Sequence, residues 1–493
     1  MSERYEVVVA GSGAGGGVVA AELSRAGRRV LLLEAGPYRT AADYQRWEAN
    51  ANHDLWWPPA FAEPAGQPGP PLPMLRGRCV GGTTAVNTKV ALRPAGHDYA
   101  KWHAAAGLEG DRGEPFSEPD LLPYLERVEH RLGVRPRADW QRCVHTVVPG
   151  FAALGAELTP VTSYTDYNCQ RCGSCLQGCP TNAGKNTLNA YLQPELSEGR
   201  LELRAGCTVR RVLIGEHGAG PEAAGIEYAS ADGSLHTAAA DVVVVAAGAL
   251  ATPGLLIRSG LAGLPAGHLI GRHLGFHVAR IVCGQFAEIQ DAHMVYPISA
   301  HCLQFAADED GGFAVEAATI QDPIGFATAL CDENDVPLWG EALAEAVRCY
   351  RYYSGLLVMA NDENNGRCWV GEDGSDRYSL RFSERERERI GRALEFARQV
   401  LTAAGARRVY QSGLVSTHVQ GGCRMGSDPA RSAVNARGES HDVRRLFVAD
   451  GSVIPRVLSV NPSLTIMALA TRLADYLHSG EHGYLRRPAA AGA

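Results

Sequence analysis

The sequence contains no run of eighteen apolar residues, so we expect no membrane-spanning helix. Internal repeats and long low-complexity segments are also absent. The first residues, Met1 to Tyr5, lead almost at once into an apolar stretch and leave no room for a signal peptide, so we expect a cytoplasmic protein. The net charge of −7 argues against a nucleic-acid partner.

What the sequence does contain is ordinary for a large globular protein. Its 493 residues are enough for two domains and a sizeable core, and 45% hydrophobic with 20% charged residues is a normal balance. Thirteen cysteines in a cytoplasmic protein are expected to be thiols or metal ligands rather than disulfides.

A glycine-rich turn near the start predicts a dinucleotide site. An apolar strand over residues 5–10 precedes the pattern G-x-G-x-x-G, which is followed by a helix to about Ala26 and a second strand from Val30 to Leu33. Such glycines let backbone N–H groups approach a pyrophosphate, and a carboxylate at the end of the next strand binds a ribose diol. The residues concerned are Gly11, Gly13, Ala14, Gly16 and Glu34.

Later segments suggest that the chain leaves the nucleotide domain and returns to it. A strand over 241–247 and a last strand over 446–450 are apolar, and a helix is expected from about Leu464 to Leu477. The middle of the chain lacks this succession of strand, turn and helix, and its composition is different. We therefore predict a nucleotide-binding domain over 1–275 with a Cys-rich loop at 165–185, an inserted domain over 276–412, a return over 413–480, and a tail over 481–493.

Three further motifs resemble the glucose–methanol–choline (GMC) oxidoreductase family, in the order that the family has them. They lie at 78–87, at 248–261 and at 417–426, the last followed by matches at 448–452 and 460–465. Ala262 replaces the final glycine of the second motif, a small departure. The resemblance covers nearly all of the chain except the middle. It implies an α/β fold: a Rossmann-like FAD-binding domain of the p-hydroxybenzoate hydroxylase/GMC type with an inserted α+β substrate-binding domain.

The resemblance also implies that the cofactor is FAD. Gly11, Gly13, Ala14, Gly16 and Glu34 would then bind its ADP half. The remaining residues implied near the cofactor are Gly82, Thr83, Asn87, Val209, Asp450, Gly451 and Thr465. Some relatives attach the flavin covalently through a histidine just before the asparagine of the first motif. That position is Val86 here, so we expect noncovalent FAD.

Two residues of the last motif are the candidate catalytic pair. Oxidation of an alcohol requires a group that accepts the hydroxyl proton while hydride passes to flavin N5, and histidine titrates in the useful range. The resemblance places that base at His418 and a hydrogen-bonding partner at Asn461. An alternative role for Asn461 is that of a helix cap before Pro462.

Four cysteines follow the spacing C-x2-C-x2-C-x3-C-P of bacterial ferredoxins. They are Cys169, Cys172, Cys175 and Cys179. Three alternatives are open: a [4Fe–4S] cluster, zinc held by four thiolates, or no metal, with the cysteines packing a loop or forming a disulfide. A cluster would let electrons leave one at a time to a carrier protein and would favour a dehydrogenase over an oxidase.

The middle of the chain carries an unusual excess of acid. From Ile281 to Val347 there are twelve acidic residues and no Lys or Arg. An acidic cover over the site would attract cations and would suit a polar, amine-bearing alcohol such as an amino sugar, whereas a solvated face or a docking surface is the alternative. Aromatic residues in the same stretch keep a long-chain alcohol or sterol oxidase open. A lyase that keeps FAD structurally and an electron-transfer subunit are the other function classes.

Overall fold

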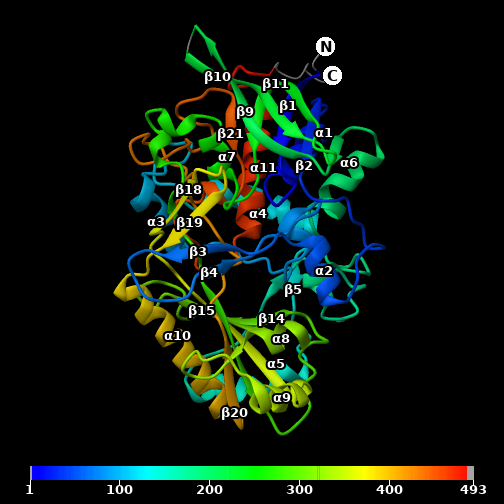
Figure 1. Cartoon of the computed structure of the whole chain (residues 1–493), viewed down its shortest axis with the longest axis vertical. Coiled ribbons are helices and arrows are strands. Elements are labelled where there is room, and N and C mark those ends of the chain that lie inside the picture. The colour runs from blue at the N-terminus through cyan, green and yellow to red at the C-terminus, as the bar shows by residue number, and fades with distance from the viewer. Residues whose placement is uncertain (1–2, 219, 319, 321–322, 486–493) are drawn as a thin grey trace.

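The computed structural model describes residues 3–218, 220–318, 320 and 323–485. A seven-stranded sheet forms the upper part of the molecule in Figure 1. Its order is β8 (Glu202–Ala205), β2 (Val30–Glu34), β1 (Arg4–Ala10), β11 (Leu235–Val245), β10 (Gly220–Ala229) and β9 (Thr208–His217), with β21 (Leu446–Val448) also paired to β11. β1 pairs in parallel with β2 and β11, and β9, β10 and β11 form an antiparallel meander.

The central strands are mostly apolar and buried. Val7, Val8 and Val9 of β1 are fully buried, as parallel strands covered on both faces require. Helix α11 (Ser463–Ser479), the last in the described chain, packs against α1 (Gly16–Arg25) and α4 (Glu118–Leu132). This is the predicted Rossmann-like nucleotide fold.

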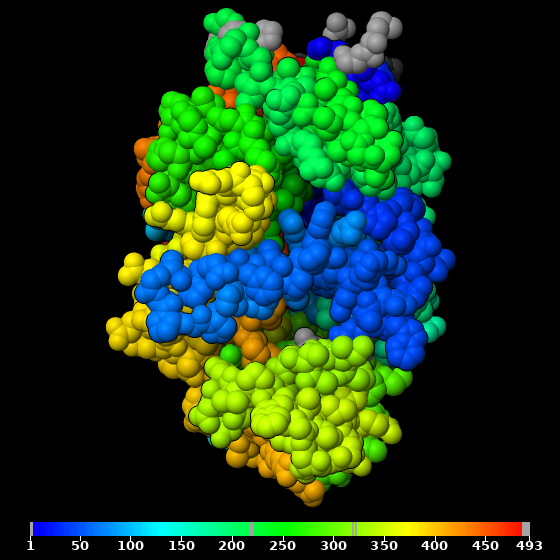
Figure 2. All heavy atoms as spheres, in the orientation of Figure 1, coloured from blue at the N-terminus to red at the C-terminus, as the bar shows by residue number. Residues whose placement is uncertain are grey.

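A second sheet joins residues far apart in sequence. Its order is β12 (Arg272–Leu274), β18 (Gly366–Val370), β19 (Asp376–Leu380), β3 (Ala60–Pro64) and β4 (Leu72–Met74). The stretch over 37–75 thus contributes two strands and the helix α2 (Glu48–Leu55). Figure 2 shows this blue part of the chain as a band across the middle of the molecule.

A third, antiparallel sheet lies in the lower part of Figure 1. Its order is β16 (Leu330–Cys331), β20 (Arg408–Ser412), β13 (Ala279–Gln285), β17 (Tyr353–Ala360), β15 (Phe313–Ala318), β14 (Ile298–Cys302) and β6 (Thr159–Pro160). Helices α5 (Arg142–Ala153) and α10 (Glu384–Ala403) pack on one face of it. The other face is therefore free to close over a site. β6 and α5 come from residues before 276, so this layer draws on more of the chain than the middle segment.

The remaining elements are short connections or cover. They are η1 (Gly82–Ala85), α3 (Gly96–Ala106), β5 (Arg135–Pro136), β7 (Thr162–Ser163), η2 (Ser174–Gln177), η3 (Leu188–Leu192), α6 (Gln193–Ser197), α7 (Thr252–Arg258), η4 (Leu261–Gly263), η5 (Gly267–Leu269), α8 (Pro323–Ala329), α9 (Gly340–Arg348), η6 (Tyr350–Tyr352) and η7 (Gly451–Val453). Among the described residues, no helix combines the length and the apolar character that crossing a membrane demands.

Candidate active site

The glycine turn after β1 brings backbone close to backbone. Gly11 has φ +103°, and a Cβ on it would lie 2.3 Å from the Ala246 carbonyl oxygen. A Cβ on Gly16 would lie 2.0 Å from the Gly11 oxygen. Gly13 differs, since a Cβ there would meet no atom of the described residues within 4 Å, its chain neighbours aside. Gly11 and Gly16 are therefore required by packing, whereas Gly13 leaves room at the N-terminus of α1, where a pyrophosphate binds in this motif.

Glu34 lies at the end of β2, next to that turn. Its carboxylate accepts hydrogen bonds from the Ser12 N–H at 3.0 Å, the Ser12 hydroxyl at 2.7 Å and the Gly36 N–H at 2.7 Å. Burial raises the pKa of Glu34, and these bonds oppose the rise. The Cys207 N–H donates to the Glu34 carbonyl at 2.8 Å, which brings the start of β9, with Val209, to the same end of the sheet.

The first family motif lies against the glycine turn. A Cβ on Gly82 would be 2.9 Å from the Gly13 Cα. Thr83 and Asn87 are already engaged within the chain. The Thr83 hydroxyl accepts from the Gly77 N–H at 3.0 Å, and the Asn87 Nδ2 donates to the Tyr164 hydroxyl at 2.5 Å. These two side chains therefore shape the turn in the structure.

Asp450 ties the last motif to the second. It accepts hydrogen bonds from the Gly248 N–H at 2.8 Å, the Thr252 hydroxyl at 2.5 Å and the Ser452 N–H at 2.8 Å. Within the described residues the buried hydroxyls of Ser452 and Thr465 have no hydrogen-bond partner. Unpaired buried hydroxyls beside a glycine cradle fit a bound polar cofactor. The residues present thus suit FAD, with Glu34 and Gly13 at its ADP half and the Asp450 and Thr465 region farther along.

His418 is held beside His277 by two short antiparallel bridges. Gly275 pairs with Gln420, and Ala279 pairs with Val415. The two ring centroids are 5.4 Å apart. Burial lowers the pKa of His418 to about 4, and burial together with His418 lowers the pKa of His277 well below its usual value. Both rings are consequently neutral at ordinary pH, and a neutral ring is the form that accepts a proton.

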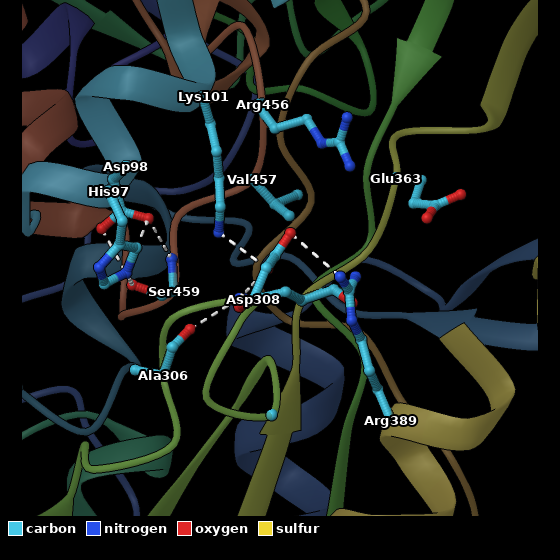
Figure 3. Close-up of polar contacts among 12 residues, drawn as sticks. His97, Asp98, Lys101, Ala306, Asp308, Glu363, Arg389, Arg456, Val457 and Ser459 are labelled. Carbon is cyan, nitrogen blue, oxygen red and sulfur yellow. Dashed lines mark hydrogen bonds and ion pairs between the residues drawn. The ribbon is translucent and has the colours of Figure 1, made fainter. Parts of the chain in front are cut away.

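Asn461 is positioned by the segment before it. Asp98 on α3 accepts from the Ser459 N–H and hydroxyl, each at 2.9 Å, and His97 contacts the same hydroxyl at 2.8 Å (Figure 3). The Leu458 N–H donates to the Gln420 Oε1 at 3.2 Å, which ties this segment to the loop of His418. α11 begins after Pro462, and Asn461 Oδ1 is buried without a hydrogen-bond partner in the described chain. The alternative role of Asn461 as the helix cap is therefore wrong.

Two further buried side chains lie beside His418 and Asn461, and neither belongs to a sequence motif. Both ring nitrogens of His277 and both carboxyl oxygens of Glu316 lack hydrogen-bond partners among the described residues. Glu316 lies on β15, is 0% exposed, and is near enough to Asn461 for the carboxamide to act on its pKa. The signal available in the sequence was weak, because Glu316 is one acid among twelve. Its position on the strand face away from α5 and α10 is what distinguishes it.

An ion network joins the lower sheet to α3 close to His277. Asp308 contacts the Lys101 Nζ at 3.0 Å and the Arg389 Nη2 at 3.0 Å, and it accepts from the Asn361 Nδ2 at 2.9 Å (Figure 3). Burial raises the pKa of Asp308, but Lys101 and the other partners outweigh burial and lower it to about 2. The charge of Lys101 also contributes to the low pKa of His277.

The acidic stretch is partly neutralised by ion pairs. At least six of its twelve acids form ion pairs, five with arginines outside the stretch and one with Lys101 and Arg389. The pairs are Glu288–Arg142, Asp291–Arg351, Asp308–Lys101 and Asp308–Arg389, Asp335–Arg280, Glu341–Arg348 and Glu345–Arg408. A sequence count misses this because the arginines come from other parts of the chain. These pairs reduce the net negative charge of the stretch, and the cation-attracting cover stays a prediction.

The four-cysteine run does not form a metal site in the structure. All four are free thiols, with Cys175 and Cys179 buried. Burial raises the pKa of Cys175 to about 12, and the Cys179 sulfur accepts from the Gly184 N–H at 3.2 Å. Within the described ranges no three His, Cys, Asp or Glu side chains are placed to hold a metal ion. The residues as arranged do not fit an iron–sulfur cluster or zinc, and the preference for a dehydrogenase loses its support.

Comparison with known proteins agrees with the geometry of the site. The N-terminal part of the GMC oxidoreductase family matches residues 8–279, and its C-terminal part matches residues 374–470. The chain belongs to the GMC oxidoreductase family. The predictions of family, fold class and an enzyme that oxidises CH–OH groups are confirmed, and FAD is the cofactor that the family supports.

Relatives of this GMC oxidoreductase include proteins with and without an assigned activity. An uncharacterized GMC-type oxidoreductase of Mycobacterium tuberculosis is 31% identical over 96% of this chain and 75% of its own length. A long-chain-alcohol oxidase of Arabidopsis thaliana is 28% identical over 95% of this chain and 66% of its own length. Among solved structures, pyridoxine 4-oxidase of Mesorbium loti has a TM-score of 0.76 at 22% identity, covering 96% of this chain and 99% of the other. Formate oxidase of Aspergillus oryzae has a TM-score of 0.71 at 14% identity, covering 98% and 100%.

Proposed function

We propose that this GMC oxidoreductase oxidises a CH–OH group with His418 as the proton acceptor and Asn461 as the group that holds the substrate oxygen. The observation that carries the proposal is that both side chains have a buried polar atom without a partner, on two segments that the Leu458–Gln420 hydrogen bond joins. His418 Nδ1 and Asn461 Oδ1 are buried without partners among the described residues. Buried polar atoms are normally paired, so unpaired ones at a site indicate a ligand that pairs them.

The chain's own residues do three things in this reaction. The Asn461 carboxamide orients the hydroxyl, and Asp98 with Ser459 fixes the backbone that carries it. A ring nitrogen of His418, neutral because burial lowers the pKa to about 4, accepts the hydroxyl proton. FAD, when bound, supplies the hydride acceptor at its N5.

The family relation bears on the substrate without naming it. The Arabidopsis relative is named as a long-chain-alcohol oxidase and the structural neighbour as a pyridoxine oxidase, so both an aliphatic and a polar alcohol are represented. Electron transfer through the four cysteines, and with it a carrier protein, is not part of this proposal because their thiols form no ligand group. The proposal also includes the domain bounds 1–275, 276–412 and 413–480. It includes flavin contacts of Gly82, Val209 and Gly451 as well.

Anaerobic addition of alcohols to the purified flavoprotein tests the proposal. We expect at least one alcohol of a panel with long-chain, polyol and amino-alcohol members to bleach the oxidised-flavin band, and readmitted oxygen or an artificial acceptor to restore it. A flavoprotein that no alcohol of the panel reduces would contradict alcohol oxidation. Restoration by the artificial acceptor but not by oxygen would identify a dehydrogenase, and restoration by oxygen an oxidase.

A further inference from the structure

Glu316 is a carboxyl group that the folded chain buries with the Asn461 carboxamide as its polar neighbour. It is 0% exposed, and neither oxygen has a hydrogen-bond partner among the described residues. Burying a polar group without a partner is unfavourable, and for an ionised carboxylate the cost is far larger. A strand position of this kind is ordinarily apolar. The carboxyl group therefore has hydrogen-bonding capacity left for a ligand that donates to it.

The carboxyl group faces the candidate active site. Phe313, Val315 and Ala317 of β15 belong to the apolar core under α5 and α10, whereas Ala314 belongs to a separate cluster. Side chains alternate along a strand, so Glu316 lies on the side of Ala314. That separate cluster also contains Ala279, two residues after His277, and packs against Val415, three residues before His418. Glu316 thus shares one wall with the two histidines and contacts the region of Asn461.

Among the described residues, no Lys or Arg forms an ion pair with Glu316. Burial raises the pKa of Glu316 to about 8, and the Asn461 carboxamide opposes the rise. The titratable neighbours are histidines: His301 is the cross-strand partner, and burial lowers its pKa as it does for His277 and His418. Lys101, whose charge acts on His277, is bound to Asp308 at 3.0 Å. The surroundings are therefore neutral, and a cation must come from outside.

We propose that Glu316 binds a cationic amine of the substrate, so that the preferred substrates are amino alcohols whose ammonium group and oxidised hydroxyl lie on one small molecule. This inference rests on the proposed alcohol oxidation at His418 and Asn461. The ammonium N–H groups donate to the two carboxyl oxygens, which satisfies both. In the free enzyme the carboxyl group is protonated at neutral pH, so binding of the ammonium ion ionises it and releases one proton.

This coupling gives a pH signature that a merely structural role would lack. Because the bound form needs the ionised carboxyl group, affinity for an amino alcohol rises by up to roughly tenfold per pH unit from pH 6 to about pH 8 and then levels off. A neutral diol of the same shape needs no ionised partner, so its affinity stays flat over this range. The amine preference over the diol therefore widens as the pH rises.

The experiment compares wild type with Glu316→Gln and with Glu316→Asp on matched pairs of an amino alcohol and the diol that replaces its amine. Initial rates of anaerobic flavin reduction are measured at pH 6, 7 and 8. We expect Glu316→Gln to lower kcat/KM for the amino alcohol by about 10²-fold, with the diol changed less than about threefold, and Glu316→Asp to recover part of the loss. Glu309→Gln, an exposed acid of the same stretch, is the matched control and should leave both rates unchanged.

Two outcomes overturn the inference: equal use of amine and diol by wild type, or an equal effect of Glu316→Gln on both. A separate binding arm uses simple alkylammonium ions without a hydroxyl and follows the visible spectrum of the bound flavin. Ammonium binding that needs Glu316 supports the inference even if no alcohol reduces the flavin, in which case only the proposed oxidation fails. Reduction by alcohols without Glu316-dependent ammonium binding leaves the oxidation standing and overturns the amine site.

Discussion

Replacement of Asp308 by asparagine removes the carboxylate that joins the lower sheet to α3. In the structure this carboxylate contacts Lys101 and Arg389, both at 3.0 Å, and the Arg389 side chain is only 1% exposed. The asparagine side chain has nearly the same shape as the aspartate but carries no charge. The change therefore leaves two cations, one of them fully buried, without their counterion.

The magnitude follows from the pKa of Asp308 and from the burial of its partner. Lowering of the pKa from 3.8 to about 2 corresponds to about 2 kcal/mol of stability, at roughly 1.4 kcal/mol per unit. Removal of one partner of a buried pair generally costs about 3–5 kcal/mol. The Asp308 side chain is 21% exposed, which reduces the upper value. We expect Asp308→Asn to lower the free energy of unfolding by about 2–4 kcal/mol.

Urea unfolding followed by tryptophan fluorescence measures this change at pH 7. Glu288→Gln is the matched control, because Glu288 pairs with Arg142 at 2.7 Å but both side chains are mostly exposed, at 75% and 61%. An exposed pair contributes about 0–1 kcal/mol. A loss for Asp308→Asn no larger than the loss for Glu288→Gln would refute the assignment of Asp308 as a buried charge centre.

The sign of the pH dependence gives a second check on the same residue. The folded pKa of Asp308 lies below the unfolded value, so its stabilising contribution is complete above about pH 4 and is lost as the pH falls toward 2. Wild type should lose this contribution over that window, whereas Asp308→Asn should not. Parallel acid profiles for the two proteins would contradict the low pKa of Asp308.

Three further predictions concern the cofactor and the thiols. Gly13→Ala should leave the unfolding of the apoprotein nearly unchanged but weaken FAD binding at least about tenfold, because its Cβ meets no atom of the described residues within 4 Å, its chain neighbours aside; a variant with wild-type flavin affinity would argue against this cradle. Flavin reduction by a neutral alcohol should stay level from pH 8 to about pH 5, because burial lowers the pKa of His418 to about 4 and keeps it neutral; a fall with a midpoint near pH 6.5 would contradict that burial. Protein purified without oxygen should lack stoichiometric iron and sulfide, and their presence would show that Cys169, Cys172, Cys175 and Cys179 rearrange into a cluster site.

The nucleotide half of the fold could be predicted because its signals are local. The strand of β1, the glycines at 11 and 16 and Glu34 at the end of β2 lie within one short stretch, and their spacing reflects direct backbone contacts. α11 was also predictable from its apolar run, and its observed bounds differ by only a residue or two. Local patterns of this kind need no knowledge of the partner segments.

The catalytic wall could be predicted only in part, because its members come from separate segments. His418 and Asn461 belong to a sequence motif. His277 lies beside His418 because of the bridges at Gly275 and Ala279, and no local sequence pattern predicts these bridges. Glu316 looked like one of many surface acids until the sheet showed which face it occupies. The arginines that pair with acids of this stretch could not be identified from the sequence for the same reason, since ion pairs form between distant parts of the chain.

The cysteine run has a strong local spacing pattern, but the part of the chain that the structure describes shows no matching group of metal ligands. Spacing alone suggested convergence of four thiolates. In the structure Cys175 and Cys179 are buried while Cys169 and Cys172 are partly exposed, and Cys179 accepts a backbone hydrogen bond from Gly184 instead. The four cysteines line one small pocket, but within the described residues no three of them are placed to hold a metal ion.

The most direct test of the central claim is the rate of anaerobic flavin reduction in His418→Ala, measured by stopped flow with an alcohol that the wild type oxidises. Loss of a general base lowers the rate by about 10²–10⁴-fold, and the variant should retain its flavin. His268→Ala, which changes an exposed histidine, should match the wild type. A His418→Ala protein that binds FAD and is reduced at the wild-type rate would contradict His418 as the proton acceptor.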